Sequence, residues 1–169
     1  MGQFTNKILA EFQPPKKWKL GRDLVYTTSD LYANEVKALK DVGVAVVRDT
    51  NKTETITVPT GFITDLASTP RLLWNVIAPF DVARAAVVHD IMYEKINTQY
   101  KAVHESAAAE EGPATKKERE TYREIADHTF LEGMNASEPP VSSWKKYAAY
   151  YAVRMFGRWA INSSAKRVA

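Results

Sequence analysis

Apolar and polar side chains alternate over much of the first 66 residues, which is the pattern of β-strands that bury one face. Residues 53–58 alternate strictly, and residues 42–48 form an apolar run rich in β-branched side chains. The polar residues 49–52 between these runs have the composition of a turn. The sequence therefore predicts a β-hairpin over residues 42–58.

Shorter strand candidates precede this hairpin at residues 8–12 and 23–27. Residues 29–40 are ambiguous. A capping residue followed by helix formers favours a helix, whereas the same segment could be a hairpin insertion. Together these segments predict a β-rich part of the chain over residues 1–66.

The spacing of apolar residues becomes helical after residue 66. Thr69 can cap a helix, and Pro70 suits the first helical position, where no amide hydrogen bond is lost. Asp81 could cap the next helix, whose apolar positions would form a broad buried face. Helices are expected at residues 71–77, 82–97, 115–134 and 142–161.

Residues 100–115 include a stretch of low complexity without a stable apolar stripe, so a mobile insertion is expected there. The order of the elements, strands first and helices afterwards, predicts an α+β fold. An N-terminal antiparallel β layer (residues 1–66) should pack on a C-terminal bundle of about four helices (residues 67–165). The whole chain, residues 1–169, is expected to form a single domain.

The composition, 45% hydrophobic and 25% charged, is typical of a globular chain. No apolar run approaches the ~20 residues that span a bilayer, and residues 1–7 lack the apolar core of a signal peptide. The chain has no cysteine, which excludes disulfides, thiolate metal sites and cysteine nucleophiles. The net charge of +3 is small and spread along the chain, so specific binding of nucleic acid is not expected.

Candidate chemistry is concentrated around His89. Tyr93 lies four residues later on the same helical face, and Asp90 points about 100° around the helix from His89. Because the neighbouring residues are apolar, these polar groups need partners. Asp127, on the following predicted helix, is the best partner: its carboxylate could fix the tautomer of His89 and leave the other ring nitrogen basic.

Asp65 is a second candidate acid, in the turn before the first predicted helix. Carboxylates and carbonyls on such a turn suit a hard cation such as calcium, so Asp65 and Asp90 are candidate metal ligands. They suit zinc less well, because zinc prefers nitrogen and sulfur ligands.

Each candidate also has a purely structural interpretation. His89 could be a hydrogen-bonded histidine of the core, and Asp65 could stabilise its own turn through nearby amides. Asp127 could form an ion pair with Arg123, one turn earlier on the same helix. Tyr93 could be a packing residue whose hydroxyl holds a carboxylate.

Three motifs together resemble an uncharacterised bacteriophage and prophage protein family, a domain of unknown function. They read V-P-x-G-F-x-T-D-x-A-S-x-P at residues 58–70, A-x-x-x-H-D-x-x-Y within residues 85–93, and A-D-x-x-F at residues 126–130. The resemblance covers about residues 18–160. It implies a phage gene, whose product would be found in the virion or in the host cytoplasm during infection.

The helix pair also resembles, more weakly, that of secreted phospholipases that cleave the sn-2 ester. By this resemblance His89 would activate water, Asp90 would bind calcium and Asp127 would orient His89. The chain departs from that family because it lacks disulfides and a glycine-rich calcium loop.

Two functions follow as expectations. The first is a phospholipase-like hydrolase that acts on the bacterial cell envelope, with His89, Asp127 and Tyr93 as its site and a divalent cation as a candidate cofactor. The second is a non-enzymatic virion component, such as a tail, baseplate or connector protein, whose partners are other phage structural proteins. A small inhibitor of host defence or host metabolism is a third reading.

Overall fold

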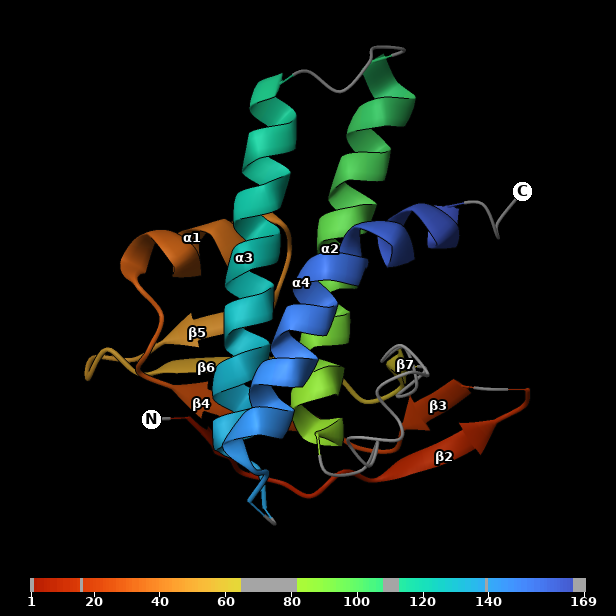
Figure 1. Cartoon of the computed structure of the whole chain (residues 1–169). Helices are drawn as coiled ribbons and strands as arrows, with labels where there is room; N and C mark the ends of the chain where they lie inside the picture. Colours follow the sequence, from red (N-terminus) through yellow and green to blue (C-terminus); the bar gives the residue numbers. More distant parts are fainter. Residues whose placement is uncertain (1, 16, 65–81, 108–112, 139, 166–169) are drawn as a thin grey trace.

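A computed structural model describes residues 2–15, 17–64, 82–107, 113–138 and 140–165. Strands come first and long helices follow, so the predicted α+β fold is confirmed (Figure 1). The strands are β1 (Gln3–Phe4), β2 (Ala10–Gln13), β3 (Lys17–Leu20), β4 (Leu24–Thr28), β5 (Val46–Arg48), β6 (Glu54–Val58) and β7 (Ile63–Thr64). The helices are α1 (Ala33–Asp41), α2 (Ala83–Ala107), α3 (Pro113–Asn135) and α4 (Ser143–Ala165).

The strands form two antiparallel sheets, where the sequence predicted one layer. One sheet has the order β1-β4-β6-β5 and the other β2-β3-β7. The backbone amide of Leu20 donates to Phe62 and that of Gly61 donates back to Leu20, which extends the pairing of β3 with β7 in the smaller sheet. Gly61 has a φ of +85°, a conformation that residues with a Cβ rarely adopt. Strands β1, β3 and β7 are not among the strands expected from the sequence.

The central pair of the larger sheet, β4 and β6, shows the alternation that the sequence predicted. In both strands every second side chain is buried. Tyr26 and Ile56 lie opposite each other in the register, and both are fully buried. Helix α2 packs against these two strands, so the inner face of the sheet and the helices share one core.

The expected turn at residues 49–52 is present between β5 and β6. The Asp49 carboxylate accepts hydrogen bonds from the backbone amides of Asn51 (2.8 Å) and Thr53 (2.9 Å). Such bonds from a side chain to its own turn are the reason why aspartate favours turns. The strand before the turn is shorter than expected and begins only at Val46.

The ambiguous segment at residues 29–40 contains helix α1. At its start, the backbone amide of Tyr32 donates to the Glu35 carboxylate (2.7 Å). At its end, Gly43 has a φ of +84°, and the amide of Val44 donates to the carbonyl of Leu39 (2.9 Å). This is the glycine-terminated hydrogen-bond pattern that commonly ends a helix. It uses up residues 42–44, which explains why β5 starts late.

Helices α2 and α3 run side by side as a long pair, and α4 crosses in front of them (Figure 1). Helix α2 was expected to end near residue 97 but continues to Ala107, and α3 begins at Pro113. The insertion expected at residues 100–115 is therefore helical at both ends, and its centre (108–112) lies outside the described residues. The predicted helix 71–77 and its start at Thr69 and Pro70 also lie outside them.

None of the helices in the described part of the chain is long and apolar enough to span a membrane.

A partly buried ion pair links β5 and β6 at one end of the larger sheet. The Glu54 side chain is fully buried on β6, and its carboxylate lies 2.9 Å from Nε of Arg48 on the neighbouring strand. The Arg48 side chain keeps 29% of its surface exposed. Because a buried carboxylate loses its hydration, this pair makes the sheet depend on Arg48.

Replacing Arg48 with methionine should lower the free energy of unfolding by about 3 kcal/mol, because Glu54 would then be a buried charge without its cation. The double variant Arg48→Met, Glu54→Leu should recover most of that loss, because neither charge remains. Urea unfolding at pH 7 measures both. An Arg48→Met variant as stable as the wild type would show that Glu54 does not need its ion pair.

Candidate functional site

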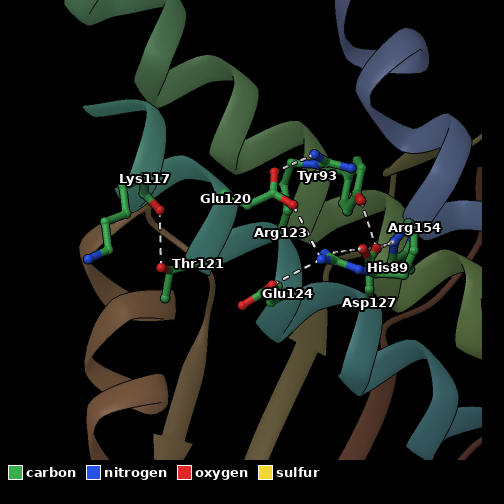
Figure 2. A network of polar contacts seen from close by, with 9 residues as sticks. All are labelled: His89, Tyr93, Lys117, Glu120, Thr121, Arg123, Glu124, Asp127 and Arg154. Atoms are coloured by element: carbon green, nitrogen blue, oxygen red, sulfur yellow. Dashed lines mark hydrogen bonds and ion pairs between the residues drawn. The ribbon is translucent and has the colours of Figure 1, made fainter. Parts of the chain in front are cut away.

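Three of the residues singled out in the sequence, His89, Tyr93 and Asp127, come together between α2 and α3. His89 Nε2 lies 2.8 Å from Oδ1 of Asp127, and the Tyr93 hydroxyl donates to the same oxygen at 2.7 Å (Figure 2). His89 and Tyr93 are one turn apart on α2, and Asp127 faces them from α3. The expected contact between positions 89 and 127, across 38 residues of sequence, is present.

This cluster is enclosed by the core. Asp127 is fully buried, while His89 and Tyr93 are each 8% exposed. The imidazole lies against the Tyr93 ring on one side (4.1 Å between centroids) and near Phe130 on another (5.2 Å). The ring is thus held in one orientation by packing as well as by its hydrogen bond.

The two ring nitrogens of His89 have different roles. An ionised carboxylate can only accept a hydrogen bond, so Nε2 carries a proton and donates to Asp127, and Nδ1 then presents a lone pair. In the part of the chain that the structure describes, Nδ1 has no hydrogen-bond partner. The side chain retains 10% of its surface exposed. This arrangement leaves a basic nitrogen that can accept a proton from a water molecule.

Arg154 completes the surroundings of Asp127, and the sequence analysis did not assign it a role. From α4, its guanidinium donates to Oδ2 of Asp127 (3.1 Å), the oxygen that His89 and Tyr93 do not use. It also binds Glu124 (3.0 Å) and Glu120 (3.3 Å) on α3 (Figure 2). The sequence held a signal for it, because Arg154 is the only charged residue between positions 147 and 157. A cation inside an apolar helical run needs an acid.

These donors decide the ionisation of Asp127. Burial alone would raise its pKa, but the hydrogen bonds from His89, Tyr93 and Arg154 outweigh burial and hold the pKa of Asp127 below its usual value. Burial, reinforced by the neighbouring Asp127 charge, raises the pKa of the Tyr93 hydroxyl, which therefore stays protonated and donates. Asp127 is an anion at neutral pH.

Arg123 does not form the ion pair with Asp127 that the sequence allowed as an alternative. Its guanidinium instead donates to Glu120 at 2.7 Å and lies 5.9 Å from the centre of the Tyr93 ring. The side chain is 2% exposed. Arg123 thus contacts Glu120, which binds Arg154, and Tyr93, which donates to Asp127.

Gly157 sets how closely α4 approaches this cluster. A Cβ at this position would lie 2.8 Å from the Tyr93 hydroxyl and 3.1 Å from a guanidinium nitrogen of Arg123. The first distance is shorter than side-chain atoms tolerate, so only glycine permits this approach. Because Arg154 lies one turn earlier on α4, the same approach brings its guanidinium to Asp127.

Asp90 points to a different neighbour. Its carboxylate accepts a hydrogen bond from the hydroxyl of Thr64, the last described residue of β7. Asp65, the other candidate metal ligand, lies outside the described residues. Within the described ranges no three histidine, cysteine or acidic residues are grouped as metal ligands.

Comparison with protein families gives one match. The model of the family described as "Protein of unknown function (DUF1353)" matches residues 41–153, more than half of the chain. The chain belongs to the DUF1353 family. The matched range contains His89, Asp90, Tyr93 and Asp127, whereas Arg154 and Gly157 lie one and four residues beyond its end. Searches of curated proteins and of solved structures found no match.

The Asp127→Asn variant of this DUF1353 chain should be less stable by about 3–5 kcal/mol at pH 7, because Arg154 would lose its buried partner. The lowered pKa of Asp127 means that its contribution is complete above the unfolded pKa and lost as the pH falls through the folded pKa. The difference between the variant and the wild type should therefore shrink below about pH 4.

Urea unfolding at pH 7 and pH 3 measures this dependence. Asp41→Asn is the matched control, because Asp41 forms an exposed ion pair with Lys37 and should change stability by about 0.5 kcal/mol or less. A difference for Asp127→Asn that does not vary with pH would contradict an ionised Asp127.

Gly157→Ala should lower the melting temperature, although the same change on a free helix surface stabilises by about 1 kcal/mol. The added methyl group would push α4 away from Tyr93. In a Tyr93→Phe background the same substitution should cost less, because the nearest atom is gone. Thermal unfolding of the four proteins of this cycle measures the effect. A raised melting temperature for Gly157→Ala would show that α4 has room to spare.

Proposed function

We propose that this protein is a phage-encoded, phospholipase-like hydrolase of the bacterial cell envelope, with His89 as general base. One observation carries the proposal. An imidazole is bound through Nε2 to a buried, ionised carboxylate, while Nδ1 has no partner among the described residues. The three sequence motifs and the resemblance of the helix pair to secreted phospholipases support the same conclusion.

The reaction would proceed by water attack on an ester. His89 Nδ1 takes a proton from water while the water oxygen bonds to the carbonyl carbon. The tetrahedral intermediate then expels the alcohol oxygen, which receives that proton from Nδ1, so the imidazole returns to its starting state. Asp127 stays ionised throughout and stabilises the transient imidazolium.

Tyr93 and Arg154 act as positioning residues in this scheme. They donate to both oxygens of Asp127, which holds the carboxylate in its orientation toward His89. A divalent cation at Asp90 and Asp65 belongs to the proposal as a second component. Carboxylate oxygens are ligands that calcium prefers, and the experiment below includes calcium for that reason.

His89→Gln should lower hydrolysis by about 10²- to 10⁴-fold, which is the usual contribution of a general base. The assay measures fatty-acid release from phospholipid vesicles and solubilisation of peptidoglycan, each with calcium and with a chelator. His128→Gln is the matched control, because His128 is exposed on α3 beside Asp127 and should retain full activity. Equal product from the wild type and His89→Gln in every condition would reject the hydrolase.

The enclosure of the same cluster favours a second candidate, a non-enzymatic virion component. Asp127 is fully buried and its donors come from both neighbouring helices. Such a network could serve only to fix the helices to one another. In that case His89→Gln would lower the melting temperature and the incorporation of the protein into particles, and no hydrolysis would be found in the wild type.

A further inference from the structure

Helix α4 has a second apolar face that no other described element covers. Trp144, Tyr147, Tyr151 and Met155 are spaced by three or four residues, so they project from one side of the helix. Their exposed fractions are 61%, 52%, 60% and 66%. We call these four residues the outer stripe. The opposite side of α4 is buried, with Ala149 fully enclosed and Gly157 against Tyr93.

The large apolar side chains that are exposed are concentrated on α4. Of the ten large apolar side chains exposed among the described residues, five lie on α4: the outer stripe and Phe156. Single exposed apolar residues need no explanation, whereas a contiguous exposed patch marks a binding surface for protein or membrane. In Figure 1, α4 lies in front of α2 and α3, and no other described element lies on the side of α4 that is turned away from them.

The chemistry of α4 favours a lipid surface as the occupant. Its sequence contains four basic residues and no acidic one. Of these, Arg154 is turned inward to the acids of α3, Lys146 donates to Asn135 at the end of α3, and Lys145 lies over the Trp144 ring at the edge of the outer stripe. Trp and Tyr have an apolar body and a polar edge, which suits the headgroup region of a bilayer. A helix with such residues on one face and basic residues beside them is typical of interfacial helices.

A second copy of the chain fits this face less well. Two α4 helices packed in parallel through their outer stripes would bring Lys145 of each copy close together, with no acidic residue on either helix to pair with it. Like charges in such an arrangement oppose association. An anionic surface offers the complementary charge, because each basic residue near it is attracted to the phosphate groups.

We propose that the outer stripe of α4 docks on an anionic phospholipid surface, with Trp144 and Tyr151 at the level of the headgroups. The docking does not require a reaction at His89. It goes beyond the proposed hydrolase because it assigns a membrane partner to a surface that the His89 site does not use.

The test measures binding of the full chain to vesicles of ether-linked phospholipids, which contain no ester bond, so that hydrolysis cannot alter the surface. Vesicles with about one-third phosphatidylglycerol are compared with pure phosphatidylcholine by co-sedimentation. The wild type should bind the anionic vesicles at least tenfold more tightly than the neutral ones. The double variant Trp144→Ser, Tyr151→Ser should lose at least tenfold in binding to the anionic vesicles.

Phe12→Ser, Val47→Ser is the matched control. Both residues are as exposed as the outer stripe but lie on the strands, and this variant should bind like the wild type. Equal binding by all three proteins, equal binding to neutral vesicles, or no binding by the wild type would overturn the proposal. Self-association in sedimentation velocity that the Trp144→Ser, Tyr151→Ser change abolishes, without vesicle binding, would assign the face to a second copy instead. None of these outcomes depends on whether His89 is catalytic.

Discussion

The helical part of this protein is organised around one ionised carboxylate buried where three helices meet. Removing a carboxylate from water costs several kcal/mol unless its oxygens are satisfied. Asp127 meets this requirement with His89 and Tyr93 on one oxygen and Arg154 on the other. Since these donors come from α2 and α4 while the acid is on α3, satisfying the charge fixes all three helices relative to one another. Position 127 thus sets the helix arrangement as well as the orientation of the imidazole.

Because Asp127 both fixes the helices and orients the imidazole, the same contacts suit a hydrolase and a structural component. A general base needs an imidazole whose tautomer and direction are fixed, and a rigid helix assembly needs a buried charge with all its partners. Both needs are met by the contact between His89 and Asp127. The two functions differ at the second ring nitrogen, Nδ1, because a general base acts through this atom whereas a purely structural network does not use it.

The features that follow from the local periodicity of the sequence were predicted. The alternation in β4 and β6 and the spacing of His89 and Tyr93 follow from strand and helix periods, and the motifs identified Asp127 as their partner. Arg154 was missed because its pairing depends on how α4 crosses α3, which periodicity does not encode. The two-residue strand β1 and the extra turns of α2 escaped because neighbouring chain segments, more than their own composition, stabilise them. Asp65 and residues 71–77 stay predictions.

Gly157 gives α4 very little freedom of movement. At Gly157 the helix backbone lies so close to the Tyr93 hydroxyl that a Cβ atom would not fit, and Arg154, three residues earlier, binds Asp127. A rotation of α4 about its own axis would move the Arg154 guanidinium relative to the Asp127 carboxylate. The position of α4 is therefore linked to that of the imidazole through one residue, Asp127, which binds both Arg154 and His89.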